Sequence, residues 1–338
     1  MQLSVIVPVY NVEKYLAFCL NSLLNQGLPV EAYEIIIIDD GAEDKSLSIA
    51  QKYQAEHPNI HVHSQENKGV GAARNKGIDL AKGKYIYFID PDDFLRHHTL
   101  NKLLEIAATS ALEILGFKSS LAKNHNKREA IIPLPDPSIE VSDGISYIGE
   151  NSFKNEVWWY LVKRDFLTKN NIRFIEGKWM EDAIFTASLF LKAQRVAFVN
   201  IDCHLHVKVP GSAMTKREAA HYTKVLFDKV HAAHVYNDLI LQLSELENIS
   251  KACKRLRTKQ ESFVFFLTAR AFRSNLNFGE LWQILLEMKE IGAYPLRHFI
   301  SNEYNGIVYR LCTVVFNNKT LLQWSYNGFR FLRSFKSK

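Results

Sequence analysis

The first 90 residues alternate between short apolar runs and segments with helical spacing, and this alternation constrains the fold more than any other feature. The predicted strands are the apolar runs LSVIVPV (3–9), EIIIIDD (34–40, ending in two aspartates) and YIYFID (85–90), and the segment IHVHSQ (60–65). Helical patterns over 13–26, 43–56 and 69–83 separate them. Because strands joined through helices run parallel, this order predicts an α/β fold with a Rossmann-like, mostly parallel sheet between two layers of helices.

Polar side chains follow three of these strands at their carboxyl ends. Pro8–Asn11, Asp39–Asp40 and Asp90–Asp93 each stand at the end of an apolar run. Ligands of open α/β sheets bind beyond the carboxyl ends of the strands. We therefore expect these polar segments to converge on one rim of the sheet.

The segment Asp90-Pro91-Asp92-Asp93 crowds three carboxylates at the end of a buried strand. Such groups repel one another unless a cation or hydrogen bonds compensate their charge. Hard oxygen ligands of this kind suit Mg²⁺ or Mn²⁺ held together with substrate phosphates. The alternative is a helix N-cap, with Asp93 capping a helix that begins at Phe94.

Asp39 and Asp40 precede Gly41 at the end of the second run. Their oxygens suit the imide N–H of a uracil or a ribose hydroxyl, but Asp-Gly is also a common strand-ending turn. The segment NKGVGAARN (67–75) is not a dinucleotide fingerprint, because Arg74 replaces the final glycine and the segment follows the third strand. The remaining interpretation is that the backbone of this segment lies close to a ligand, with Lys68 or Arg74 facing a nucleotide.

A second acidic pair, Glu181-Asp182, opens a helical pattern over 178–192. A carboxylate there could act as a general base toward an attacking hydroxyl, although acids at a helix start are also favoured by the macrodipole. Further on, His204, His206 and Lys208 alternate along one face of a predicted strand. With the following loop, 210–215, they could hold a leaving diphosphate.

Taken in order, VIVPVYN, IIIIDDGAEDKS, NKGVGAARNKGI, YIYFIDPDDFL and WMEDAIFTASLF resemble the inverting glycosyltransferases of family 2, which have the GT-A nucleotide-sugar-binding fold. The resemblance covers about residues 1–215. It departs at Ala42, where relatives usually carry a serine, so one hydroxyl is absent.

The resemblance implies a role for each motif. The nucleotide would contact Pro8, Val9, Tyr10, Asn11, Glu13, Asp40, Lys68 and Arg74, with Asp39 beside them. A divalent cation, Mn²⁺ or Mg²⁺, and the diphosphate would bind the D-x-D element of Asp90, Pro91, Asp92 and Asp93. Asp182 would be the base, and Glu181 would support it or contact the acceptor. His206, Lys208 and Ser212 would lie on the loop over the diphosphate, with His206 as a further metal ligand.

The implied reaction transfers a sugar from a nucleotide-diphosphate sugar, with UDP as the expected nucleotide, to a hydroxyl of a glycan or lipid-linked acceptor with inversion. The expected setting is bacterial capsule, exopolysaccharide or O-antigen synthesis. A nucleotidyltransferase that makes nucleotide sugars is one rival, but such enzymes usually open with a glycine-rich loop that VIVPVYN lacks. A catalytically inactive nucleotide-binding module is another, and the intact acidic motifs argue against it.

We expect a GT-A catalytic domain over 1–215, with a nucleotide-binding half (1–110) and an acceptor half (111–215), and a helical, basic C-terminal region over 216–338. From Lys251 onward there are 15 Lys and Arg, 5 Glu and no Asp, a net charge of +10. The whole chain carries +6, so residues 1–250 carry a net charge of −4. Two interpretations would explain the positive charge of this C-terminal region: a solvated helical surface, or a site for an anionic partner. An anionic membrane fits the interleaved aromatics of 327–336. No nucleic-acid motif accompanies the charge.

The four cysteines are far apart and form no C-x-x-C pair, so a structural zinc site or a disulfide framework is not expected. The N-terminus lacks the basic region and cleavage site of a signal peptide, and no uncharged run reaches the roughly 18 residues of a membrane span. These patterns predict a cytoplasmic protein, attached to the inner face of the cell membrane if the tail binds lipid.

Overall fold

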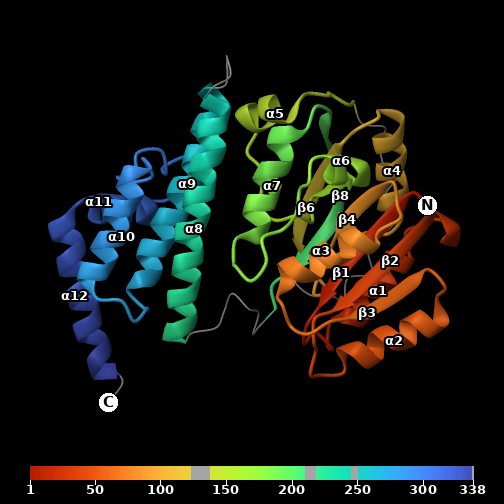
Figure 1. Ribbon diagram of the computed structural model, residues 1–338, viewed down its shortest axis with the longest axis horizontal. Helices are drawn as coiled ribbons and strands as arrows, with labels where there is room; N and C mark the ends of the chain where they lie inside the picture. The colour runs from red at the N-terminus through yellow and green to blue at the C-terminus, as the bar shows by residue number, and fades with distance from the viewer. Residues whose placement is uncertain (123–137, 210–217, 245–249, 337–338) are drawn as a thin grey trace. The chain divides into compact units, whose positions relative to one another are not determined.

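The computed structural model describes residues 1–122, 138–209, 218–244 and 250–336. The chain divides into two compact units, which we call the sheet unit and the helical unit. The sheet unit comprises Met1–Tyr147 and Phe153–Pro210, and the helical unit comprises Ile148–Ser152 and Gly211–Lys338. Figure 1 shows the sheet and its covering helices in the first unit and the array of helices in the second.

The strands of the sheet unit form one mixed sheet in the order β3-β2-β1-β4-β7-β6-β8-β5. Their bounds are β1 Leu3–Val9, β2 Tyr33–Asp39, β3 Ile60–Ser64, β4 Tyr85–Phe88, β5 Phe94–Leu95, β6 Ile114–Ala122, β7 Tyr160–Lys163 and β8 Val196–Val207. The first four strands are parallel, as predicted, and so are β6 and β8. β7 runs antiparallel to both β4 and β6, and β5 runs antiparallel to β8.

The strand register brings the predicted rim together. Val9 lies opposite Asp39, so β1 and β2 end level with each other. Phe88, the last residue of β4, lies opposite Ile6, and the Ile89 amide donates to the Ile6 carbonyl. The chain therefore leaves β4 beside the end of β1 and delivers the acidic segment that follows to the same edge.

Helices cover both faces of the sheet, as the sequence predicts. Their bounds are α1 Leu16–Leu24, η1 (a 3-10 helix) Val30–Ala32, α2 Ser46–Glu56, α3 Val70–Leu80, α4 Thr99–Thr109, α5 Gly144–Glu150, α6 Arg164–Lys169 and α7 Glu181–Lys192. Apolar residues of α1, α2 and α4 share a core with Val5, Val7 and Ile37. On the other face, Phe88 contacts Phe185 of α7, and Ile6 lies against α3.

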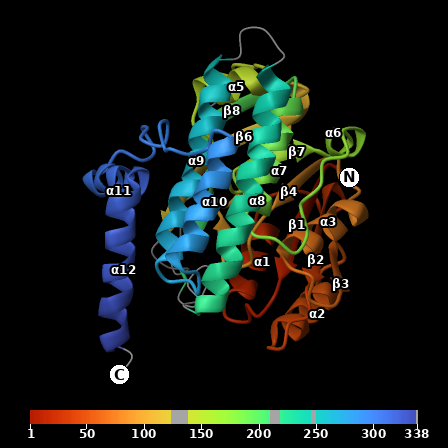
Figure 2. The same ribbon diagram turned by 60° about the vertical axis from the view of Figure 1, so that its left-hand side comes forward.

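The helical unit contains α8 Ala219–Ser244, α9 Ser250–Ala271, α10 Phe278–Glu290, α11 Ile307–Asn317 and α12 Lys319–Lys336. Figure 2 shows α8, α9 and α10 side by side. Aromatic stacking fills its core: the ring of Phe265 lies 4.1 Å from that of Phe299 and 5.1 Å from that of Phe316. In the described residues, no helix is long and apolar enough to cross a membrane.

Candidate active site

Arg74 joins two of the predicted acidic motifs. It lies on α3 with only 5% of its surface exposed. One terminal nitrogen lies 2.9 Å from Oδ1 of Asp90, beyond the end of β4, and the other lies 3.0 Å from Oε1 of Glu181, the first residue of α7. The guanidinium also lies over the ring of Phe174. Motifs about ninety residues apart in the sequence therefore meet on a single buried cation.

The acids after β4 are crowded, as expected. Asp90 and Asp92 are partly exposed, whereas Asp93 is fully buried. Burial raises the pKa of Asp92 to about 7, and the negative charges of Asp90 and Asp93 add to the rise. A carboxyl group that resists ionisation beside other carboxylates is one that a divalent cation would stabilise in its charged form.

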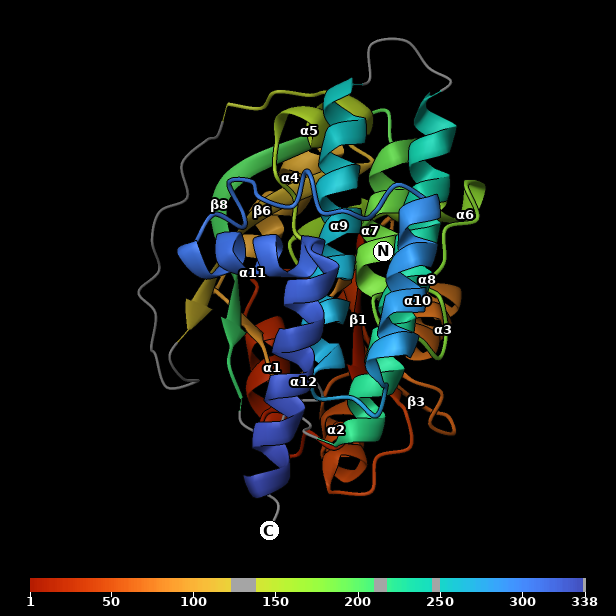
Figure 3. The same cartoon turned by 90° about the vertical axis from the view of Figure 1, so that its left-hand side faces the viewer.

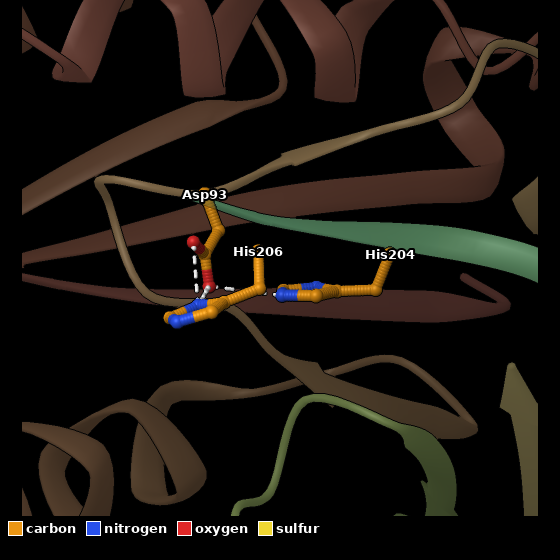
Figure 4. Close-up of side chains that lie close together, drawn as sticks. All are labelled: Asp93, His204 and His206. Atoms are coloured by element: carbon orange, nitrogen blue, oxygen red, sulfur yellow. Dashed lines mark hydrogen bonds and ion pairs between the residues drawn. The ribbon is translucent and has the colours of Figure 1, made fainter. Parts of the chain in front are cut away.

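Asp93 does not cap a helix, so that interpretation of the sequence is wrong. The residues after it form β5, in which Phe94 pairs with Leu205 of β8. Its carboxylate accepts hydrogen bonds from His204 Nε2 at 2.9 Å, from His206 Nδ1 at 3.1 Å and from the amide of Val207 at 2.9 Å. Figure 4 shows the carboxylate joined to both imidazoles by dashed lines. The Asp93 carboxylate thus receives its hydrogen bonds from residues of β8 and not from the amides of a helix N-terminus.

These contacts also set the charge of the cluster. Burial alone would raise the pKa of Asp93, but the hydrogen bonds from His204 and His206 outweigh it and hold that pKa below its usual value. The same hydrogen bond raises the pKa of His206 against the effect of its partial burial. Asp93, His204 and His206 bring ligand atoms within 4.8 Å of one another, a spacing that could hold a metal ion.

Two aromatic residues complete this cluster, and sequence reasoning gave neither a role. The hydroxyl of Tyr87 lies 2.8 Å from Nδ1 of His204. The Trp158 ring stacks on His204 with a centroid distance of 4.4 Å and on His206 at 5.7 Å. The ring of His206, 40% exposed, is therefore held in one orientation at the rim. The sequence predicted Asp93 and His206 at one site, but no spacing in it pointed to Tyr87 or Trp158.

The second acidic pair lies at the N-terminus of α7, where the macrodipole favours it, as the alternative reading proposed. Glu181 is held by Arg74. The Asp182 carboxylate accepts a hydrogen bond from the amide of Ala183 at 2.7 Å. Burial and the neighbouring charge of Glu181 raise the pKa of Asp182 to about 8. Burial also raises the pKa of Glu181, against the opposing effect of Arg74.

Asp39 and Asp40 hold loops in this structure. Asp39 accepts a hydrogen bond from the amide of Ala42, which is the strand-ending turn that the sequence left open. Asp40 accepts from the amides of Lys68 and Gly69, both at 2.9 Å, and from the side chain of Gln65. Asp40 thus positions the segment that opens α3. A contact of either acid with a nucleotide stays a prediction.

Asn11 and Glu13 have a similar role. The Asn11 side chain accepts a hydrogen bond from the amide of Glu43, and Glu13 accepts one from the amide of Lys45. They tie the loop after β1 to the loop before α2. This explains why α2 begins at Ser46 and not near residue 43, where the helical pattern starts.

The remaining predicted residues are placed individually. Pro8 and Val9 end β1, and Pro91 is buried within the acidic segment. Tyr10 is 44% exposed, and Lys68 and Lys208 are exposed. Ser212 lies outside the described residues. The structure thus brings together Arg74, Asp90 and Glu181, and separately Asp93 and His206.

The comparisons with known proteins agree with this architecture. The protein EpsJ of Bacillus subtilis (strain 168), an uncharacterized glycosyltransferase, is 34% identical over 218 residues, which cover 62% of this chain and 62% of that protein. The poly(ribitol-phosphate) beta-glucosyltransferase of Bacillus spizizenii is 31% identical over 221 residues, which cover 64% of this chain and 34% of that protein. The chain therefore spans less than two thirds of the length of either relative.

Among solved structures, residues 1–349 of S. aureus TarS in complex with UDP-GlcNAc superpose with a TM-score of 0.67 at 22% identity. The match covers 97% of this chain and 92% of that one, and it confirms the predicted GT-A fold. Residues 4–221 match the sequence profile of the family "Glycosyl transferase family 2". That match covers more than half of the chain and contains every acidic motif described above, so the chain belongs to glycosyl transferase family 2.

Proposed function

We propose that this protein transfers a sugar from a UDP-sugar to a hydroxyl of a glycan or lipid-linked acceptor, with inversion at the anomeric carbon. The observation that carries the proposal is the bridge from Asp90 through Arg74 to Glu181. It puts the acids expected to hold the diphosphate beside the acids expected to activate the acceptor. Both partners of a single displacement need to be held in this way.

The acids after β4 fit a divalent cation. Asp90 and Asp92 would bind Mn²⁺ or Mg²⁺ with carboxylate oxygens, and His206 would supply an imidazole nitrogen from the rim of β8. Asp93, already bonded to both histidines, orients His206 and remains a predicted ligand. When bound, the cation neutralises charge on the leaving nucleoside diphosphate. The raised pKa of Asp92 supports this proposal, because burial and then the charges of Asp90 and Asp93 disfavour its ionised form, which a cation would stabilise.

Asp182 would accept the proton of the acceptor hydroxyl as that oxygen attacks the anomeric carbon. A base is most effective when its pKa lies near the working pH, and burial raises that of Asp182 to about 8. Glu181, held by Arg74, would fix the start of α7 and contact the acceptor. The nucleotide would lie along Pro8–Asn11, Glu13, Asp39, Asp40 and Lys68, with Lys208 and Ser212 over the diphosphate.

The relatives suggest the setting of the reaction. One acts on poly(ribitol-phosphate), and the TarS structure contains UDP-GlcNAc. We infer that this chain builds a cell-envelope polysaccharide from a UDP-sugar at the inner face of the cell membrane. We further propose that residues 1–215 form the catalytic domain, with 1–110 for the nucleotide and 111–215 for the acceptor, and that 216–338 form an accessory helical region.

The test begins with purified full-length protein and a panel of nucleotide sugars with Mn²⁺ or Mg²⁺, in which slow release of the nucleoside diphosphate reports the donor. Asp182→Asn should bind the donor as well as the wild type does and turn over about 10²–10⁴-fold more slowly, the usual worth of a general base. Glu181→Gln is the matched control. If Asp182→Asn is active and Glu181→Gln is not, the base is Glu181. If no nucleotide sugar is consumed, transferase activity is excluded.

A further inference from the structure

The outer side of α12 is apolar. Leu321, Trp324, Phe331, Leu332 and Phe335 are between 39% and 70% exposed. At 3.6 residues per turn, these five positions fall on one side of the helix. Side chains of this size are normally buried, and a contiguous exposed set marks a surface that another phase or molecule covers.

The inner side of α12 is already packed. Leu322 and Tyr326 are buried, and the Tyr326 hydroxyl donates to the carbonyl of Leu276 at 2.6 Å. Arg330 also donates to that carbonyl, and Arg333 donates to the carbonyl of Arg273 at 3.1 Å. The helix is thus fixed with its arginines toward the unit and its aromatic side outward. Turning it over would break these bonds, so the unit cannot cover the outer residues itself.

The neighbouring helix α11 also carries exposed apolar residues. On α11, Ile307, Val308, Leu311 and Val314 are between 61% and 74% exposed, while Phe316 packs inward. Figure 3 shows α11 running across the end of α12. We call the outward residues of both helices the C-terminal apolar face: Ile307, Val308, Leu311, Val314, Leu321, Trp324, Phe331, Leu332 and Phe335.

The charge of this part of the sequence has one sign. After Glu303 it contains no acidic residue and six basic ones: Arg310, Lys319, Arg330, Arg333, Lys336 and Lys338. A second copy of the same face would bring net positive charge against net positive charge, with no carboxylate on these helices to compensate it. An anionic surface would be attracted by this net positive charge.

We propose that the C-terminal apolar face lies in the headgroup region of an anionic lipid bilayer. Helices that insert an apolar side among the acyl chains and attract lipid phosphates with basic residues bind in the plane of the membrane. Trp324, at 70% exposure, suits the polar–apolar boundary of such a surface. No described helix spans a bilayer, so the attachment is peripheral. The inference goes beyond the proposed chemistry and holds whichever sugar is transferred.

Co-sedimentation with liposomes tests the proposal. Full-length protein should bind vesicles that contain phosphatidylglycerol at low salt, bind pure phosphatidylcholine vesicles far more weakly, and dissociate as salt rises. Trp324→Ser with Leu332→Ser should weaken binding at least tenfold. Its control, Phe227→Ser with Leu241→Ser, changes two exposed apolar residues of α8 and should not weaken it.

A further variant tests the charge. Arg310→Ser should weaken binding to anionic vesicles about fivefold, because each basic residue near such a surface contributes about a factor of five. Lys254→Ser removes the same charge from an exposed position on α9 and should have little effect. Circular dichroism establishes that each variant is folded. The proposal is overturned if folded wild type does not bind anionic vesicles. It is equally overturned if Trp324→Ser with Leu332→Ser dissociates an oligomer and leaves vesicle binding unchanged.

Discussion

Replacing Arg74 with methionine would remove the cation that joins two acidic motifs while keeping most of the side-chain volume. Arg74 is 5% exposed and bonds Asp90 at 2.9 Å and Glu181 at 3.0 Å. Breaking a buried ion pair by removing one partner typically costs 3–5 kcal/mol, since the other charge is left without compensation. The Asp90 side chain is 34% exposed and retains water, whereas that of Glu181 is only 9% exposed. We therefore expect Arg74→Met to lower the free energy of unfolding by about 3 kcal/mol, the lower end of this range.

The loss of stability caused by Arg74→Met should depend on pH. Burial already raises the pKa of Glu181, and Arg74 opposes that rise. Without Arg74, the folded state would hold the Glu181 proton to still higher pH, while the unfolded chain would release it near the ordinary value for glutamate. The folded state then binds more protons in that window, so its stability falls as pH rises. Arg74→Met should consequently be more destabilising at pH 8 than at pH 5.

Calorimetry of the full-length protein is the appropriate assay, because the two units can unfold in separate transitions. For a unit of 150–250 residues, 3 kcal/mol corresponds to a fall in Tm of about 6–12 °C. The control is Arg173→Met, which removes an exposed arginine paired with Asp79 and should cost less than about 1 kcal/mol. If the two variants lower Tm equally, Arg74 is not the link that we describe.

Two further results are expected of the active enzyme. Asp92→Asn keeps the size of the side chain and removes one charge from the proposed cation site. Turnover and metal-dependent donor binding should therefore be lost, while Tm should not change. Activity of the wild type in excess EDTA would contradict the metal assignment. With Mg²⁺, kcat/KM should rise with pH up to about 8, because the base must be ionised and burial raises the pKa of Asp182 to that value. In Asp182→Asn the rise should disappear, and a wild-type profile that is flat from pH 6 to 9 would refute the assignment.

The sheet could be predicted because its strands are buried on both faces. Residues 3–9 and 34–40 are continuous apolar runs, and the structure has β1 and β2 over Leu3–Val9 and Tyr33–Asp39. Parallel strands must place their carboxyl ends on one edge, so the convergence of the polar segments followed from the order of elements alone. Local patterns were sufficient for the strands themselves but not for their full order, since β4 lies beside β1 and not beside β3.

The partners of each polar side chain could not be predicted in the same way. The sequence left an N-cap open for Asp93 as the alternative to a metal site, but the contacts that decide its environment come from His204 and His206 more than a hundred residues later. Arg74 was expected to face a nucleotide. Its terminal nitrogens contact Asp90 and Glu181, a pairing that the sequence did not predict, and its contact with a nucleotide stays a prediction. These pairings depend on how β8 and α7 pack, which no local spacing records.

Arg74 also explains why the two acidic motifs can act together. Asp90 follows a strand and Glu181 begins a helix, so their elements could shift relative to each other without disturbing either motif. The guanidinium prevents this, because its two terminal nitrogens diverge in one rigid plane and each bonds a different carboxylate. A lysine has a single nitrogen and could not span both in the same geometry. Arg74, one buried side chain of α3, thus helps to fix the distance between the proposed cation site and the proposed base beside Glu181.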